Sequence, residues 1–203
     1  MRSDFSLLVV SCVVLATLFS GCSSTPKVER MGVEEVRDLS GRWNDTDSRL
    51  VAEQMISDVL RRPWLQEFRT AKGRKPVVIV GTVRNRSSEH IEVGTFISDI
   101  ERELINSGSV KFVATSGERS EVRAERLDQQ SYSTQATARR LAAETGADYM
   151  LKGSIKTTID AVSGKQVKFY QVDLELIGLE NNEKVWMGCK KIKKFVKRSR
   201  VKW

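Results

Sequence analysis

Residues Lys75-Pro76-Val77-Val78-Ile79-Val80-Gly81-Thr82-Val83 include a continuous β-branched run from Val77 to Val80. A strand with one solvated face alternates apolar and polar residues, whereas an unbroken run is typical of a strand buried on both faces of a sheet. We therefore expect residues 75–83 to form a central strand.

A helix and a second strand are predicted directly after this central strand. Thr95 can cap a helix that ends at Gly108 and carries apolar residues at helical spacing. Those residues are Phe96, Ile97, Ile100, Leu104 and Ile105. Residues 110–114 then form a short strand. Strand, helix and strand then form a β-α-β unit, whose two strands should be parallel and whose crossover should be right-handed.

A further helix is predicted before the central strand. Its apolar residues are Leu50, Val51, Met55, Ile56, Val59 and Leu60. Asp45 and Asp47 precede them, and carboxylates in a first turn accept hydrogen bonds from unpaired amides and favour the helix dipole. Capping therefore explains them better than an acid–base pair. Pro63 ends this helix, and Trp64, Leu65 and Phe68 form a short apolar piece that closes the core.

The carboxy-terminal half predicts an exposed helix or ordered loop over 118–129, a helix over 134–145 and then three strands. Apolar residues alternate with polar ones from Tyr149 to Thr157, and turn residues near Ser163 and over 180–183 separate strands at 166–178 and 184–196. The fold class is therefore α/β, or α+β. We expect a single domain whose mixed sheet of four or five strands is flanked by helices, with a β-α-β unit followed by an antiparallel meander.

The amino terminus resembles a bacterial lipoprotein signal. The apolar run from Phe5 to Phe19 has 15 residues, fewer than the roughly 20 that span a bilayer. Leu18-Phe19-Ser20-Gly21 then precedes Cys22, so cleavage before Cys22 would leave its thiol to carry a diacylglycerol. An uncleaved anchor or an ordinary signal peptide is the alternative.

These observations predict four segments. Residues 1–21 form the signal peptide, 22–42 a lipidated amino terminus and flexible tether, 43–196 a globular domain and 197–203 a basic tail. The remaining length suits one domain of ordinary size, which we expect to be monomeric. The roughly 20 residues of the tether reach about 70 Å when fully extended, which keeps the domain near its membrane.

Positive charge is concentrated at the carboxy terminus. Eight cations with no acid among them match the net charge of +8: Lys190, Lys191, Lys193, Lys194, Lys197, Arg198, Arg200 and Lys202. Because the rest of the chain is balanced, a nucleic-acid-binding protein is not expected. The basic patch is either an edge strand that lysines keep from aggregating or a surface for an acidic partner or lipid headgroups.

The sequence offers no catalytic or metal-binding pattern, and we expect no cofactor. Its single histidine is His90, and Cys189 is expected to be a buried, inert thiol in an apolar strand. The loop Arg84-Asn85-Arg86 lies where open α/β sheets often bind ligands, but it lacks the glycines that let a phosphate approach the backbone. A glycan-cleaving enzyme would need a carboxylate pair, and no such pair is identifiable.

Several separate blocks, in order, resemble the LpoB-type penicillin-binding protein activator lipoproteins over about residues 39–195. The blocks are Gly41 to Ala52, Pro63-Trp64, Arg74 to Gly81, Arg84 to Ser87 with Glu89-His90-Ile91, Leu104 to Gly108, and Gly146 to Gly153. The resemblance implies a mixed sheet flanked by helices. It also implies an outer-membrane lipoprotein on the periplasmic side that binds a class A penicillin-binding protein and stimulates peptidoglycan synthesis.

The leading hypothesis is thus an interaction protein that shifts a partner enzyme toward its active conformation and performs no chemistry itself. Candidate residues for the partner surface are Arg42, Trp43, Arg84, Asn85, Arg86 and His90. The last block alone also suits the CsgG-type export lipoproteins. A structural or export-associated role is therefore the alternative, and it predicts a stable ring with membrane-spanning strands.

Overall fold

The structure is a computed structural model that describes residues 28–32, 35–131 and 146–197. From Val36 onward the described residues belong to one compact unit, and those up to Glu35 belong to another. The helices of the unit that begins at Val36 are α2 (Asp45–Leu60), α3 (Pro63–Lys72), α4 (Val93–Asn106) and α5 (Ser116–Ser131). The strands are β1 (Val77–Asn85), β2 (Lys111–Phe112), β3 (Tyr149–Val162), β4 (Lys165–Gly178) and β5 (Lys184–Lys197).

The five strands form one mixed sheet in the order β2-β1-β3-β4-β5. Strand β1 pairs in parallel with β2 and with β3, whereas β3, β4 and β5 form an antiparallel meander. The predicted fold class, the parallel β-α-β unit and both hairpin turns are confirmed. The strand predicted over 110–114 pairs over two residues only, Lys111 and Phe112.

Helix α2 begins with a capping box in which Asp47 has the predicted role, but the N-cap residue is Asn44. The Asn44 side chain accepts a hydrogen bond from the Asp47 amide, and the Asp47 carboxylate accepts one from the Asn44 amide. This reciprocal pair satisfies two amides that have no partner within the helix. The segment after Pro63 is a full helix, α3, with Pro63 in its first turn, where a missing amide hydrogen costs nothing.

Helix α4 begins earlier than predicted. The Glu92 carboxylate accepts a hydrogen bond of 2.9 Å from the Gly94 amide and caps the helix, so Thr95 lies inside its first turn rather than at its cap. The predicted helix over 118–129 is present as α5. The one predicted over 134–145 lies outside the described residues.

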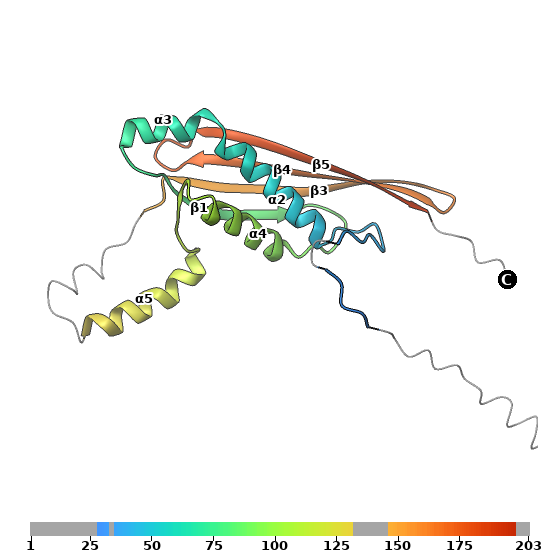
Figure 1. Ribbon diagram of the computed structural model, residues 1–203, viewed down its shortest axis with the longest axis horizontal. Coiled ribbons are helices and arrows are strands. Elements are labelled where there is room, and N and C mark those ends of the chain that lie inside the picture. Colours follow the sequence, from blue (N-terminus) through green and yellow to red (C-terminus); the bar gives the residue numbers. More distant parts are fainter. Residues whose placement is uncertain (1–27, 33–34, 132–145, 198–203) are drawn as a thin grey trace, which may run out of the picture. The chain divides into compact units, whose positions relative to one another are not determined.

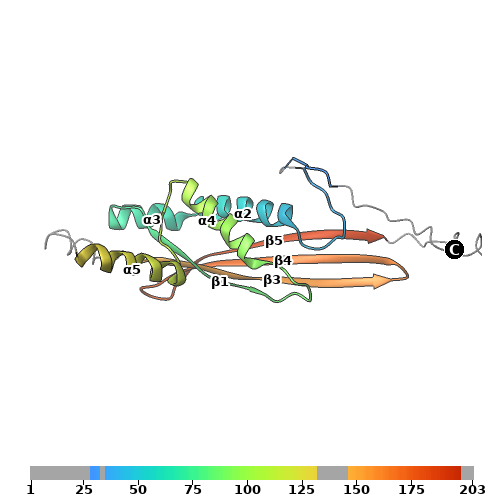
Figure 2. The ribbon, with the colours of Figure 1, turned by 90° about the horizontal axis from the view of Figure 1, so that it is seen from below.

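Helices α2, α3 and α4 lie on one side of the sheet, as Figure 1 and Figure 2 show. Along β4 every second residue from Lys168 to Gly178 is buried, and these residues face α2 and α4. The hydrophobic core lies between this face of the sheet and the helices. Its most fully buried large side chains include Tyr170, Phe96, Ile56, Ile100, Leu151 and Ile155.

The opposite face of the sheet is only partly covered by its own side chains. Residues between the buried ones of β4 are all of intermediate exposure, and those of β5 are exposed. Cys189 belongs to this open face and is exposed, so the expectation of a buried thiol is wrong. The strand alternates, and Cys189 falls one residue away from the helix-facing positions.

Candidate partner-binding surface

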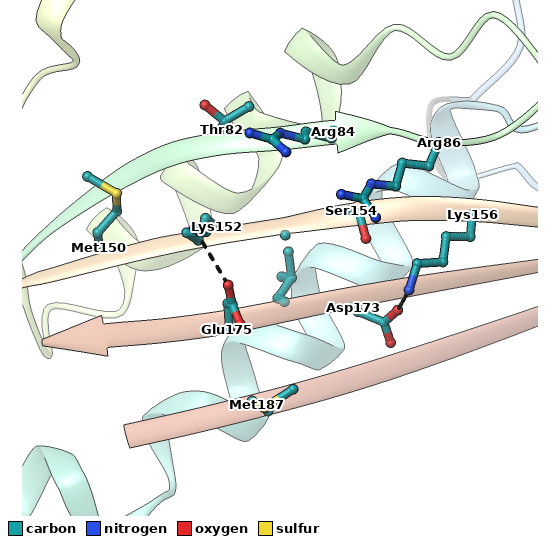
Figure 3. Close-up of a pocket in the computed structure, with 12 residues that line it drawn as sticks. Thr82, Arg84, Arg86, Met150, Lys152, Ser154, Lys156, Asp173, Glu175 and Met187 are labelled. Carbon is teal, nitrogen blue, oxygen red and sulfur yellow. Dashed lines mark hydrogen bonds and ion pairs between the residues drawn. The ribbon is translucent and has the colours of Figure 1, made fainter. Parts of the chain in front are cut away.

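A shallow groove of about 570 Å³ crosses the open face of the sheet (Figure 3). Strand β1 and the turn after it contribute one wall, β3 the floor, and β4 and β5 the other wall. The residues that line it are Thr82, Arg84, Arg86, Met150, Lys152, Gly153, Ser154, Lys156, Asp173, Leu174, Glu175 and Met187. Four of these are cations, so the groove carries positive charge.

Arg84 and Arg86 provide the cations of the groove that have no counter-ion. Arg84 pairs with Ser154 of β3, and the Arg86 amide donates a hydrogen bond of 2.8 Å to the Ile155 carbonyl, so the backbone fixes both positions. Neither guanidinium has a hydrogen bond or ion pair with any residue that the structure describes. Such groups can bind carboxylates in a fork geometry.

The lysines of the groove are neutralised by a row of acids on β4. Lys156 Nζ lies 2.9 Å from Asp173 Oδ2. Glu175 is shared, with Lys152 Nζ at 3.8 Å and Lys184 Nζ at 2.6 Å. Burial acts to raise the pKa of Asp173, but hydrogen bonds from Lys156 and Gln171 outweigh it and hold the pKa below its ordinary value. Asp173 is therefore ionised at neutral pH.

The six candidate residues predicted for the partner surface do not lie together. Arg84 and Arg86 line the groove, whereas Asn85 points elsewhere and orders the loop after β1. Its side chain donates to the Glu89 carbonyl at 2.8 Å and accepts from the Ser87 amide at 2.9 Å. His90 is exposed in the same loop.

Trp43 is a packing residue on the helix side of the sheet. Its ring meets Phe96 and Tyr170 edge to face, with centroids 6.1 Å and 5.7 Å apart. Its indole Nε1 donates a hydrogen bond of 2.8 Å to Ser48 Oγ. The Arg42 side chain is exposed, and its carbonyl accepts from Lys194 Nζ at 3.2 Å. Trp43 is therefore a poor candidate for direct partner contact.

Glu89, which the sequence did not single out, anchors the loop after β1 to the core. Its carboxylate accepts hydrogen bonds of 2.6 Å from both Lys168 Nζ and the Tyr170 hydroxyl. Burial acts to raise the pKa of Glu89, but these two donors outweigh it and lower the pKa. Burial and the Glu89 carboxylate together raise the pKa of Tyr170. Glu89 is thus ionised and Tyr170 protonated near neutrality.

The cations of β5 fall on both faces of an edge strand, so they do not form one patch. Lys191, Lys193 and Lys197 are exposed on the open face, whereas Lys190 is half-buried on the helix side and hydrogen-bonds to Gln54. Lys194 is buried, so its predicted place in an exposed basic patch is wrong. Its Nζ atom lies 2.6 Å from both Asp38 Oδ1 and Asp47 Oδ2. Arg198, Arg200 and Lys202 lie outside the described residues.

Residues 38–42, which were expected to belong to the flexible tether, contact the globular domain. Lys194 holds Asp38, and the Tyr170 hydroxyl donates to the Gly41 carbonyl at 3.1 Å. Burial acts to lower the pKa of Lys194, but its two carboxylate partners raise it above its ordinary value. The residues from Asp38 to Arg42 are therefore held against β5.

Sequence reasoning missed the acids of the groove, although a signal for them exists. Asp173 and Glu175 occupy alternate positions of β4 between the apolar residues, and Lys152 and Lys156 do the same on β3. Period-two charges of opposite sign on neighbouring strands indicate cross-strand pairs on one face. The sequence does not show the register between β3 and β4, which decides which of these charges lie opposite each other.

The described residues contain no cluster of three or more histidine, cysteine, aspartate or glutamate side chains that could hold a metal ion. No helix in this part of the chain has both the length and the hydrophobicity that are needed to cross a bilayer.

Comparison with known proteins identifies the family. Residues 47–192 match the family described as "Peptidoglycan-synthase activator LpoB", which agrees with the resemblance found in the sequence. A search of curated proteins finds no match.

Solved structures with similarity to this chain include three of LpoB. The C-terminal domain from Salmonella enterica is 20% identical over 65% of this chain and 94% of that chain, with a TM-score of 0.37. The C-terminal domain from Escherichia coli is 20% identical over the same shares, with a TM-score of 0.39. The NMR structure of E. coli LpoB is 16% identical over 88% of this chain and 85% of that chain, with a TM-score of 0.40. Because the family match extends from the first turn of α2 into β5, this chain belongs to the LpoB family of peptidoglycan-synthase activators.

Proposed function

We propose that this chain is a periplasmic lipoprotein, anchored in the outer membrane by a diacylglycerol on Cys22, that binds and activates a class A penicillin-binding protein. The observation that carries the proposal is the family match over residues 47–192, which covers nearly all of the sheet-and-helix body. The lipoprotein signal that ends at Cys22 supports the anchor. The protein acts as a regulator and not as a catalyst.

The groove on the open face is the partner-binding surface in this proposal. Arg84 and Arg86 hold two desolvation-tolerant cations without counter-ions among the described residues, on a rigid sheet. A partner that offers carboxylates would gain charge-assisted hydrogen bonds there. Activation follows if the partner presents those carboxylates more favourably in its active conformation, because binding then shifts the population toward that conformation.

The first experiment measures binding and glycan polymerisation by purified class A penicillin-binding proteins from the same cell, with and without this protein. Binding accompanied by a faster rate is expected. No binding and unchanged rates would remove the proposal. Mass determination of the mature amino terminus tests the anchor separately, with acyl groups expected on Cys22 and absent from a Cys22→Ser variant.

The second experiment tests the groove. The double variant Arg84→Glu/Arg86→Glu is expected to weaken partner binding by tenfold or more, because each buried charge pair at an interface is worth about 2 kcal/mol or more. Lys75→Glu/Lys111→Glu makes the same charge change at exposed positions outside the groove and is expected to bind normally. Equal loss in both variants would show that net charge, and not the groove, determines binding. A stable ring in detergent would instead favour the CsgG-like alternative.

A further inference from the structure

The β3–β4 hairpin and the end of β5 extend beyond the helices that cover the sheet (Figure 1). Strand β3 is exposed from Thr158 through Val162, whereas its earlier residues Leu151 and Ile155 are buried. This end of the sheet therefore presents its side chains to the surroundings and does not contribute them to the core.

Apolar side chains are concentrated at this end of the open face. Val167 and Phe195 lie opposite each other on β4 and β5, and Phe169 follows on the same face. Phe195 is 65% exposed and Val162 is 69% exposed. Contact between water and these apolar side chains is unfavourable, and covering them with a nonpolar phase would be favourable.

Lysines surround this apolar group. Lys165 pairs with Lys197, and Lys193 pairs with Phe169, so all three lie on the same face. All three are exposed, and none has an ion pair or hydrogen bond with another described residue. Asp160, opposite Val167, is the acid of this group. Apolar residues ringed by uncompensated lysines suit the boundary between anionic headgroups and acyl chains.

The chain from the expected anchor enters the body at this same end. Asp38 binds Lys194, and Gly41 packs so closely on Val196 that an added Cβ would lie 2.2 Å from its Cγ2 atom. Lys194 and Val196 flank Phe195 directly in β5. The 17 residues from Cys22 to Asp38 span at most about 60 Å when fully extended. An acyl group on Cys22 therefore keeps the end that carries Phe195 close to the membrane.

We propose that Val162, Lys165, Val167, Lys193, Phe195 and Lys197 form a hairpin-end surface that binds anionic lipid bilayers directly. Phe195 and Val162 enter the headgroup region, and the three lysines bind the phosphates. This contact rests on the anchor proposed above and adds to it, because a lipid anchor at one residue restrains position but not orientation. The contact would orient the sheet on its membrane, with the hairpin end of its open face toward the lipid.

The test uses the chain from residue 22 onward with Cys22→Ser, so that no acyl group contributes. Its co-sedimentation is measured with vesicles of phosphatidylglycerol and phosphatidylcholine in equal parts, and with phosphatidylcholine alone. Binding to the anionic vesicles, weakened by added salt, is expected. Lys165→Ala/Lys193→Ala/Lys197→Ala should weaken it on the order of a hundredfold, about fivefold for each lysine near an anionic surface. Phe195→Ser should weaken it about tenfold.

Matched variants at the other end of the sheet provide the controls. Met187 is 67% exposed on the same face of β5, and Met187→Ser should leave binding unchanged. Lys72→Ala/Lys75→Ala/Lys111→Ala removes the same charge from exposed positions elsewhere and should weaken vesicle binding less than tenfold. Thermal unfolding confirms that each variant is folded.

Three results would overturn the proposal. These are no binding of the parent chain to anionic vesicles, equal losses in the two triple-lysine variants, or a Phe195→Ser change that dissociates a dimer without altering vesicle binding. The last result would assign the surface to a second copy of the chain. Because the assay contains neither an acyl group nor a synthase, its failure would leave the proposed anchor and activator function untouched.

Discussion

Lys168 Nζ lies 2.6 Å from Glu89 Oε1, and the two side chains are only 8% and 11% exposed. The pair joins the loop after β1 to β4, and the Tyr170 hydroxyl donates to the other carboxylate oxygen. The same loop begins with Arg86 and includes His90, so the pair sets where the edge of the groove lies. A buried ion pair of this kind is costly to break from one side, because the remaining charge loses its counter-ion.

Glu89→Gln is expected to lower the free energy of unfolding by about 3–5 kcal/mol, since it leaves Lys168 buried without a counter-ion. Glu53→Gln provides the control, because Glu53 forms an exposed i,i+4 pair with Arg49. Exposed pairs of this kind contribute under about 0.5 kcal/mol. Urea unfolding of both variants measures the difference, and similar losses would contradict a special role for Glu89.

The contribution of Glu89 should depend on pH. Its folded-state pKa lies below the ordinary value, so its stabilisation is present above the unfolded pKa of about 4.3 and is lost as the pH falls through the folded pKa. The stability gap between the parent chain and Glu89→Gln should therefore be full near pH 7 and shrink below about pH 4. Urea titrations across this range test it, and a gap that widens with acid would contradict it.

Lys194→Met should destabilise the fold by about 3–5 kcal/mol, because it leaves the buried Asp47 carboxylate without its cation. It should also release Asp38, so limited proteolysis within residues 36–43 should become faster. Lys191→Met, on the open face of the same strand, should change neither quantity. Unaltered cleavage in Lys194→Met would mean that this lysine does not hold the segment.

Gly41→Ala should lower the free energy of unfolding by about 3 kcal/mol. Gly41 has φ +63°, and its new Cβ would collide with Val196. Gly108→Ala isolates the backbone contribution, because Gly108 has φ +61° with no atom near the new Cβ, and should cost about 1–2 kcal/mol. Calorimetry of the two variants separates packing from backbone strain. Equal losses would show that the contact with Val196 is unimportant.

The fold was predictable because its main elements have strong periodic signals. The unbroken run Val77–Val80 marks the central strand, and the turns at Ser163 and over 180–183 mark the meander. The caps were partly predictable, since Asp47 follows a recognisable pattern, whereas Glu92 lies before any clear helical periodicity and was missed.

The candidate site was less predictable because it depends on register. Trp43 and Arg86 were both candidates for one partner surface, yet Trp43 packs against Phe96 and Arg86 lies on the open face. The partners of Lys194 are more than 140 positions away, and no local pattern marks such a contact. Faces of strands can be predicted from alternation, but the residues that meet across strands cannot.

The exposure of Cys189 on the open face has a practical consequence. The chain has three cysteines, and with Cys12 in the predicted signal and Cys22 acylated, the mature protein would keep one free thiol. Partial desolvation and the neighbouring Asp173 raise the pKa of this thiol, so it resists oxidation near neutrality and reacts more readily in mild alkali. A spin label or fluorophore attached there would report on the sheet surface without any engineered substitution.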